Sequence, residues 1–250
     1  MSRFKGRPRP NRRWPERRVL LMRRASTAVE IMDLPDCDPR RLERTYRQFA
    51  VVNRALSGWR RLYRKELRPL LTDESATTLL DIGSGGGDLA VSLARWADRD
   101  KLKLEVTGID PDWRAHRFAA GRPKIPGVDF RQAHSSDLLR EGRSYDVVIS
   151  NHVLHHLQPA ELQLLLSESQ ALSRRKALHN DLRRSPAAYA LFSVAALPFR
   201  GSFIRADGLT SIRRSYTPAE LSELSPPGWR IEPHSPFHQL LVHRKDGLDA

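Results

Sequence analysis

The sequence has a single cysteine, Cys37, among 250 residues and no long apolar run. One cysteine excludes an internal disulfide and fits a reducing compartment, so we expect a cytoplasmic protein. No apolar stretch approaches the roughly 18 residues that a membrane-spanning helix needs. No apolar core of about 7–15 residues follows the basic start of the chain, which argues against a secretory signal. The length fits one α/β domain with extensions, or two small domains.

Acidic residues are scarce at the start of the chain. Residues 1–24 contain ten basic residues and one acid, Glu16, and thus carry +9 of the net charge of +14. This stretch is rich in Arg and Pro and has little to bury, so we predict a disordered basic tail over residues 1–30. Three interpretations stay open: contact with nucleic acid or an anionic membrane, a solvated extension without a specific role, or a true start at Met22.

The spacing of apolar residues predicts a helical segment followed by an α/β region. Helical spacing runs from Arg40 to Leu71, after the start signal Asp38-Pro39, and Gly58 predicts a break into two helices. We define a helical N-terminal cap over residues 31–73. Strands and helices then alternate, which predicts a mostly parallel sheet covered by helices on both faces. The strands are expected at 77–82, 102–109, 128–132, 146–150 and 177–182, and the helices at 88–97, 111–120 and 159–172.

The last part of the chain predicts a different arrangement. An apolar helix is expected at 185–199, followed by a loop and a small helix at 217–224. Two terminal strands are expected at 229–233 and 238–243, separated from that helix by a Ser-Pro-Pro-Gly turn.

A glycine-rich loop follows the first predicted strand. The stretch LLDIGSGGGD, Leu79 to Asp88, places four glycines in five residues, and such a loop lets the backbone approach a bound molecule closely. It lacks the Gly-Lys-Ser/Thr ending of a Walker A motif. The dinucleotide pattern G-x-G-x-x-G fails from Gly83, but G-x-G-x-x-A fits from Gly85. The loop alone therefore leaves the ligand open.

Two acids and a polar segment narrow the choice. Asp81 stands two residues before the glycines, where a carboxylate suits an ammonium or sulfonium better than a pyrophosphate. Asp110 ends the second strand, where an acid can accept hydrogen bonds from both ribose hydroxyls. The fourth strand runs into SNHVLHHL at 150–157, which places titratable groups at the carboxyl end of the sheet. Ligands of open α/β sheets bind at that end.

These segments resemble a known family. LLDIGSGGGD, VTGIDPD and YDVVISNHVLHHL are similar, in that order, to motifs of the class I S-adenosylmethionine-dependent methyltransferases. The resemblance covers Leu79 to Asp181 and is strongest to ubiquinone/menaquinone-type and phenol methyltransferases of small molecules. It implies a Rossmann-like seven-stranded sheet with helices on both faces and an antiparallel last strand. It also implies a methyltransferase domain over 74–250 with a lid-like insertion at about 183–216.

The resemblance implies roles for the residues around the loop. Gly83, Gly85 and Gly87 would line the methionine moiety of S-adenosylmethionine, and Asp81 would face its ammonium group. Asp110 would hold the ribose hydroxyls. Pro111 or Asp112 would flank the adenine.

The adenine contact departs from the family pattern. Many relatives carry an acid after the third strand, but here His134 stands at that position in FRQAHSSDLL. Three contacts with the adenine amino group stay open: the ring of His134, the carboxylate of Asp137, or the backbone of Ser135.

The histidines after the fourth strand are candidate general bases. A histidine can deprotonate a phenol or carboxyl nucleophile near neutral pH, and we name His152 and His155. The alternative is that they cap the next helix or pack beneath the site. Asn151 and His152, closest to the strand end, are expected to face the cofactor. One cysteine and no helical HExxH motif argue against zinc, so we expect no metal.

The end of the fifth strand offers further candidates. Asp181 or His179 could act as the base, and Arg183 and Arg184 could steer an anionic substrate. In the helix that follows, aromatic side chains could line an apolar pocket or simply pack in a core; they are Tyr189, Phe192 and Phe199.

The favoured function is methyl transfer from S-adenosylmethionine to an oxygen of an aromatic or lipid-like small molecule, with carbon as the less favoured acceptor atom. Alternatives are methylation of RNA, a non-catalytic cofactor-binding module, or a dehydrogenase. Against RNA, the fourth strand lacks the Asn/Asp-Pro-Pro-aromatic segment of nucleic-acid amino methyltransferases, and no cysteine pair serves pyrimidine carbon methylation. The acceptor is therefore expected to be a small aromatic or apolar molecule.

Overall fold

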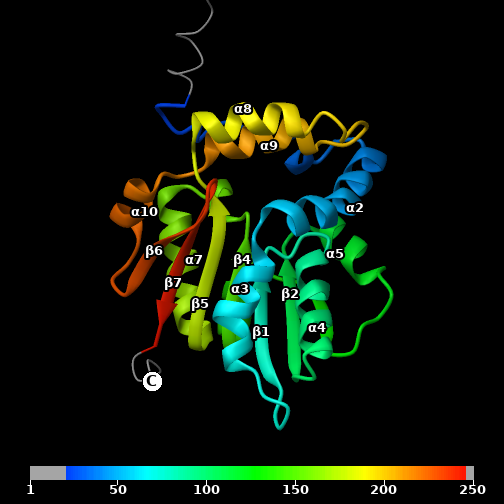
Figure 1. Ribbon diagram of the computed structural model, residues 1–250, viewed down its shortest axis with the longest axis vertical. Coiled ribbons are helices and arrows are strands. Elements are labelled where there is room, and N and C mark those ends of the chain that lie inside the picture. Colours follow the sequence, from blue (N-terminus) through cyan, green and yellow to red (C-terminus); the bar gives the residue numbers. More distant parts are fainter. Residues whose placement is uncertain (1–20, 246–250) are drawn as a thin grey trace, which may run out of the picture.

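A computed structural model describes residues 21–245, and within them one sheet has seven strands in the order β3-β2-β1-β4-β5-β7-β6 (Figure 1). Strands β1 to β5 are parallel, whereas β7 runs antiparallel to both β5 and β6. The expected sheet with its antiparallel last strand is thereby confirmed. The strands are β1 Thr77–Ile82, β2 Leu104–Asp110, β3 Val128–Gln132, β4 Tyr145–Asn151, β5 Ser173–Leu182, β6 Trp229–Ser235 and β7 His238–Arg244.

Helices cover both faces of the sheet, as expected. Successive strand residues point to opposite faces, so Leu79 and Leu80 of β1 enter two separate apolar cores. Leu79 packs with Leu93 on one face, and Leu80 packs with Leu166 on the other. The covering helices are α4 Asp88–Arg99, α5 Trp113–Ala120, α6 Ser135–Arg140, α7 Pro159–Leu172 and α10 Pro218–Leu224.

The segment that we define as the cap is helical, and a break between two helices falls at Gly58. The Asp38 side chain accepts hydrogen bonds from the first backbone amides of α2, which satisfies donors that a helix start leaves free. Gly58 has a φ of +70°, and a β-carbon there would lie 2.3 Å from the ring of His234. The cap consists of α2 Pro39–Leu56, α3 Trp59–Leu62, a π-helical turn η2 Tyr63–Leu67 and a 3-10 turn η3 Arg68–Leu70.

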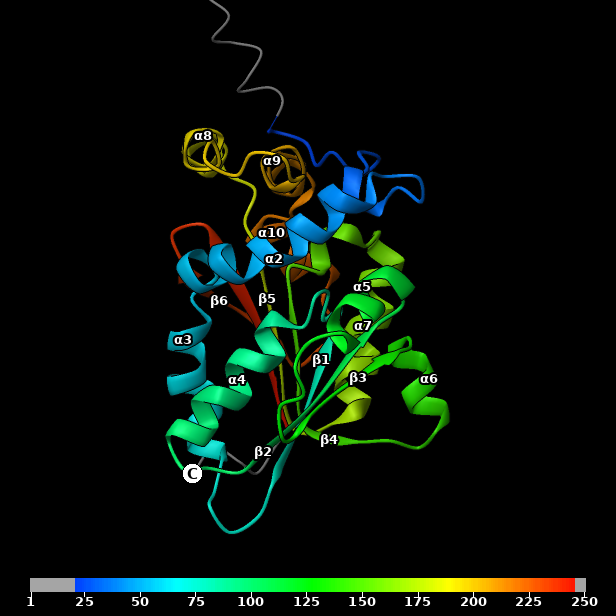
Figure 2. The ribbon, with the colours of Figure 1, turned by 90° about the vertical axis from the view of Figure 1, so that its right-hand side faces the viewer.

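Two helices, α8 Pro186–Ala195 and α9 Ile204–Arg214, lie above the carboxyl ends of the strands (Figure 2). The sequence predicts a loop where α9 stands, and this prediction is wrong. The buried face of α9 includes the polar Asp207 and Ser211 beside Ile204 and Ile212. The sequence therefore has no continuous apolar stripe that would predict this helix. The short helix α6 was also missed.

Residues 21–30 pack against the domain, so a tail drawn through residue 30 is too long. Leu21 joins a small apolar cluster with Ala188 of α8 and Ile212 of α9. Arg24 lies 4.0 Å from the ring centre of Tyr216, and its guanidinium donates to backbone carbonyls of three other residues. The first 20 residues of the predicted tail lie outside the described residues. No helix within residues 21–245 is long and apolar enough to cross a membrane.

Candidate active site

The glycine loop connects β1 to α4 through three left-handed glycines. Gly83, Gly85 and Gly87 have φ values of +68°, +52° and +76°, which disfavour other residues. A β-carbon at Gly83 would lie 2.6 Å from Val153, and one at Gly87 would lie 2.4 Å from Phe130. One at Gly85 would meet nothing within 4 Å. Gly83 and Gly87 are therefore needed for packing, whereas Gly85 borders space that a ligand can enter.

Asp81 is a buried carboxylate without a partner at the base of this loop. Its side chain is 1% exposed, and its Oδ2 has no hydrogen-bond partner in the described part of the chain. Burial raises the pKa of this carboxyl well above its ordinary value, and the charges of Asp88 and Asp110 raise it further. A buried anion is costly unless it is paired. A cationic ligand beside Gly85 would supply that pairing.

Asp110 joins the end of β2 to the glycine loop. Its Oδ2 accepts a hydrogen bond from the Gly85 amide at 2.9 Å, and its Oδ1 accepts one from the Asp112 amide at 2.9 Å. Burial raises its pKa. A carboxylate offers about four acceptor positions, so two remain for the hydroxyls of a ligand. We call Asp81, Gly85 and Asp110 the glycine-loop half of the site.

The residues expected near adenine form the start of α6. The amide of His134 donates to Asp137 Oδ2 at 2.8 Å, and Asp137 also pairs with Arg140, so this acid serves as a helix cap. The Ser135 hydroxyl donates to the buried Glu168. His134 itself is exposed.

Asn151, at the end of β4, connects the sheet to the helical cap. Its Oδ1 accepts hydrogen bonds from Trp59 Nε1 at 2.8 Å and from Asn180 Nδ2 at 3.0 Å. Its own amide group donates to Asn53 Oδ1, and Asn53 in turn donates to Asp88. The cap is therefore held at the carboxyl edge of the sheet by a chain of polar contacts that reaches the glycine loop.

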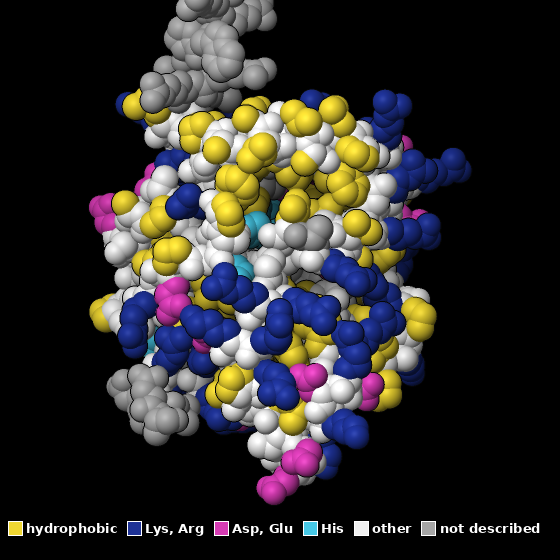
Figure 3. Space-filling view, in the orientation of Figure 1, with side chains coloured by type: hydrophobic (Ala, Val, Ile, Leu, Met, Phe, Trp, Pro, Cys, Tyr) yellow, Lys and Arg dark blue, Asp and Glu magenta, His cyan; other side chains and the backbone are white. Residues whose placement is uncertain are grey.

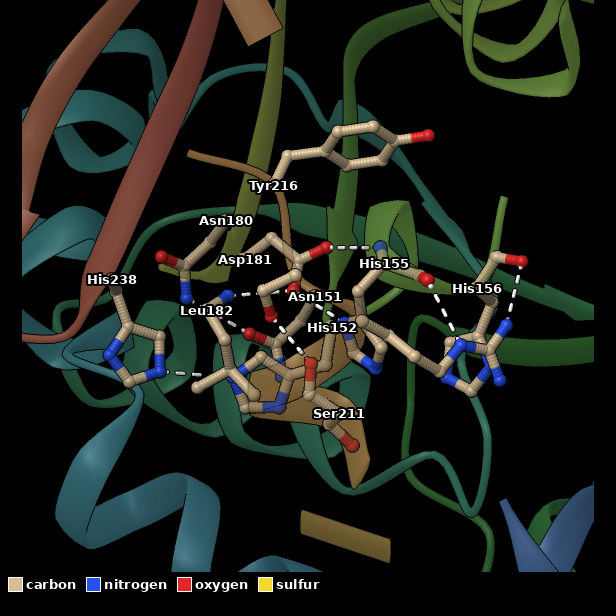
Figure 4. Close-up of polar contacts among 12 residues, drawn as sticks. Asn151, His152, His155, His156, Asn180, Asp181, Leu182, Ser211, Tyr216 and His238 are labelled. Carbon is tan, nitrogen blue, oxygen red and sulfur yellow. Dashed lines mark hydrogen bonds and ion pairs between the residues drawn. The ribbon is translucent and has the colours of Figure 1, made fainter. Parts of the chain in front are cut away.

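His152 follows in a left-handed conformation that is uncommon outside glycine, with a φ of +58°. Its Nε2 lies 3.1 Å from Nε2 of His238, and the two rings are stacked (Figure 4). Burial lowers the pKa of His152 to about 4 and that of His238 to about 3, so both rings are neutral at pH 7. A neutral imidazole in a strained turn can accept a proton from a bound hydroxyl.

The protonation state of His155 is opposite to that of His152. His155 is 2% exposed, and Asp181 accepts from both its Nδ1 and its backbone amide at 2.7 Å (Figure 4). Burial alone would lower the pKa of His155, but the charges and hydrogen bonds of Asp181 and Glu30 raise it to about 10. The contacts with His155 lower the pKa values of both Asp181 and Glu30 to about 2 despite burial. His155 and Asp181 therefore form an ion pair.

The other residues predicted near the end of β5 are engaged in packing. His179 is fully buried, its Nδ1 lies 2.7 Å from Ser150 Oγ, and burial lowers its pKa to about 3. Arg184 is 8% exposed and pairs with Glu220 at 2.7 Å, so it does not face solvent as a steering residue would. Arg183 donates to a backbone carbonyl. We call Glu30, His152, His155, Asp181 and His238 the histidine half of the site.

Two of the three aromatic residues predicted to line a pocket or pack in a core are found packed in a core. Tyr189 and Phe192 of α8 pack against the cluster that contains Leu21 and Ile212. The ring of Phe192 lies 2.3 Å from where a β-carbon of Gly208 would stand, so this glycine lets α8 and α9 approach. Phe199, after α8, is half-buried.

The profile of the methyltransferase-domain family matches residues 79–176, from β1 into β5. Residues 79–176 of this chain thus belong to the methyltransferase-domain family. The family segment includes Asp81, the glycine loop, Asp110 and the histidines after β4. Helices α8 and α9, the cap and the terminal strand pair lie outside it.

Curated relatives match the same part of the methyltransferase domain. The ubiquinone biosynthesis O-methyltransferase of Rhizobium etli is 32% identical over 100 residues, which cover 39% of this chain and 36% of that protein. The protein of the same name from Azorhizobium caulinodans is 29% identical over 134 residues, 53% of this chain and 49% of that one. The chain therefore spans about a third of the length of the first relatives that it matches.

Solved structures share the fold of the methyltransferase domain. The plantazolicin methyltransferase BpumL in complex with SAH has a TM-score of 0.57 at 12% identity, covering 82% of this chain and 95% of that chain. Human N-acetylserotonin methyltransferase in complex with SAM has a TM-score of 0.56 at 16% identity, covering 80% and 54%. At these identities the likeness concerns the fold.

Sequence reasoning missed several residues that the structure brings to the candidate site. Glu30 reaches His155 from the segment before the cap, and His238 reaches His152 from the antiparallel β7. Trp59 and Asn53 reach Asn151 from the cap. Local sequence carries no signal for these contacts, because each depends on how distant elements are folded together.

Proposed function

We propose that this chain uses S-adenosylmethionine to methylate an oxygen of an aromatic or lipid-like small molecule. The observation that carries the cofactor part is the unpaired, buried carboxylate of Asp81 beside the open space at Gly85. The cofactor has an ammonium group that would satisfy this anion, and ribose hydroxyls that suit the two free acceptor positions of Asp110. The residues present therefore fit the group.

The adenine end is the least constrained part of this proposal. Asp137 and the Ser135 hydroxyl are already engaged in α6 and with Glu168, so the exposed ring of His134 or the backbone of Ser135 is the better candidate. Asp112 is engaged as well, because it caps α5 and pairs with Arg114 at 2.7 Å. Pro111 is then the residue that would flank the base.

An apolar opening supports a small aromatic or lipid-like acceptor. Figure 3 shows a hollow below α8 with apolar side chains around it and histidine side chains within it. Large apolar side chains on and just after α8 are exposed, namely Leu191, Val194 and Leu197. Binding pockets of small molecules combine such apolar walls with a few polar groups. RNA recognition would instead require phosphate contacts.

In the proposed reaction the cofactor supplies a methyl group that is already activated, so the protein mainly aligns the acceptor and excludes water. His152 is the proposed base, because its imidazole is neutral and can take the proton of an acceptor hydroxyl. His155 and Asp181 are proposed as positioning residues. Both His155 nitrogens face carboxylates, and the ion pair fixes the turn that presents His152.

Calorimetry with S-adenosylhomocysteine tests the cofactor site. Wild-type protein should bind one equivalent, and Asp110→Ala should weaken binding at least about 100-fold, because two hydrogen bonds to a charged group are each worth about 1.5–3 kcal/mol. Asp129→Ala, an exposed acid on β3, is the matched control and should bind normally. An absence of binding, or binding unchanged by Asp110→Ala, would refute the assignment.

The acceptor is tested separately by following methyl transfer to a panel of phenols and hydroxylated quinone-like compounds, with total RNA as a parallel substrate. Methylated phenol with no methylated RNA supports the proposal. Transfer to RNA alone, or cofactor binding without transfer to any acceptor, favours the RNA enzyme or the non-catalytic module respectively.

A further inference from the structure

Glu30, His155 and His156 direct three ligand atoms at one point, and all three atoms lie within 4.8 Å of one another. We infer that these residues bind a divalent metal ion of the zinc type. The site extends beyond the proposed function, because neither the cofactor contacts nor His152 requires it.

One of the distances equals that of a tetrahedral site, and a second is slightly longer. Nε2 of His155 lies 3.4 Å from Glu30 Oε1, and Nε2 of His156 lies 3.8 Å from the same oxygen. Zinc–ligand bonds of about 2.0–2.1 Å place tetrahedral ligand atoms about 3.3–3.4 Å apart. Both separations exceed the usual 2.7–3.2 Å of a good N–H···O hydrogen bond. Small side-chain movements would close the three atoms around an ion.

The outer contacts have the arrangement that orients metal-binding histidines. Nδ1 of His155 lies 2.7 Å from Asp181, and Nδ1 of His156 lies 3.1 Å from Asp33. A carboxylate on Nδ1 fixes the tautomer and leaves Nε2 as the ligand. Here both histidines have such a carboxylate, and Ser211 donates to Glu30 at 2.8 Å. Every ligand therefore has a supporting partner.

The site is closed on one side and open on the other. The side chains of Glu30 and His155 are 4% and 2% exposed, whereas those of His156 and Asp33 are 31% and 39% exposed. Two histidines and a glutamate with an open fourth position are the ligand set of several zinc enzymes. An ion would replace the proton that His155 Nε2 directs at Glu30 and release it to solvent.

The competing explanation is a metal-free lock, in which a protonated His155 bridges Asp181 and Glu30. Both explanations hold residues 30–33 against the turn after β4. They differ in what His156 and Asp33 do. A lock does not need either residue, whereas a metal site needs His156 as a ligand and Asp33 as its support.

The test is titration of EDTA-treated full-length protein with Co²⁺, followed by visible absorption, and with Zn²⁺, followed by calorimetry. We expect one equivalent per chain and absorption bands of tetrahedral Co²⁺. His156→Ala should abolish these bands, and Asp33→Asn should weaken affinity about 10–100-fold, as for other outer-shell partners. His134→Ala, another exposed histidine, is the matched control and should bind the ion normally.

His156 and Asp33 are half-exposed, so their variants should fold, which circular dichroism and thermal unfolding will check. Absence of stoichiometric binding to wild-type protein, or binding that survives His156→Ala, overturns the inference and supports the lock. Calorimetry with S-adenosylhomocysteine on the same metal-free protein separates this failure from a failure of the proposed function.

Discussion

The two halves of the site handle buried charge in opposite ways. In the glycine-loop half, Asp81 and Asp110 have raised pKa values, and no cation of the described chain pairs with Asp81. In the histidine half, Asp181 and Glu30 have lowered pKa values, because His155 lies between them. The first half has no cation to balance its charge without a ligand, whereas in the metal-free protein the charges of the second half balance one another. Ligand binding should therefore stabilise the first half most.

The largest expected effect is on catalysis and concerns His152. His152→Ala should lower kcat about 100- to 10,000-fold, the usual range for loss of a general base, once an acceptor is known. Affinity for S-adenosylhomocysteine should stay unchanged, because the glycine-loop half is intact. Asp129→Ala, the exposed acid on β3, serves as the control. A variant that keeps kcat within threefold of wild type would show that the acceptor needs no base from this residue.

Breaking the ion pair between His155 and Asp181 should have the next largest effect, which is a loss of stability. Asp181→Asn removes the shorter of the two ion pairs of the buried His155 and leaves Glu30 as its carboxylate partner, so the free energy of unfolding should drop by about 3–5 kcal/mol. Urea unfolding in EDTA measures this change. Asp98→Asn, at an exposed position on α4, should have almost no effect. A loss below 1 kcal/mol would mean that the histidine half tolerates the loss of this pair.

Neutralising Asp81 should not destabilise the protein, in contrast to Asp181→Asn. Asp81→Asn removes a buried, unpaired carboxylate, so the metal-free, ligand-free protein should unfold at an equal or higher temperature. The same variant should bind S-adenosylhomocysteine at least about tenfold more weakly, since a charge-assisted hydrogen bond is worth about 1.5–3 kcal/mol. Thermal unfolding and calorimetry give both values. Weaker binding together with marked destabilisation would remove the contrast between the halves.

The buried neutral histidines predict a smaller, pH-dependent effect. The pKa is lowered by burial to about 4 for His152 and to about 3 for His179 and His238. Below pH 6.5 the unfolded chain binds protons that the folded chain does not, so stability should fall as pH drops from 6.5 toward 4. Each histidine contributes about 1.4 kcal/mol per pH unit in that window.

Urea unfolding of wild type and His238→Gln at pH 7.0, 6.0 and 5.0 tests this expectation. The variant should show a shallower slope by about 1.4 kcal/mol per pH unit, because one titrating group is gone. Gln132→Ala, at an exposed residue that does not titrate, should keep the wild-type slope. Equal slopes for wild type and His238→Gln would mean that His238 titrates normally.

The sequence predicted the sheet well because its signals are local. The limits expected for the first strand, the third strand and the helix at 159–172 coincide with β1, β3 and α7. Apolar strands, helix caps and the glycine loop are each encoded by neighbouring residues. Helix α9 was missed because its contacts are not local. Its buried Asp207 accepts hydrogen bonds from the backbone amides of Ile31 and Met32, far away in the chain.

The sequence by itself determined the order of the strands with helices α4, α5 and α7 between them, the glycine loop at Gly83 to Gly87, and the two acids that frame it. All of these lie within single strand–loop–helix units, whose short-range geometry the chain fixes locally. Only the tertiary structure decided the charge states of the histidines. Burial and the distant carboxylate of Glu30 set them, so that His152 is neutral while His155, three residues on, is held as a cation.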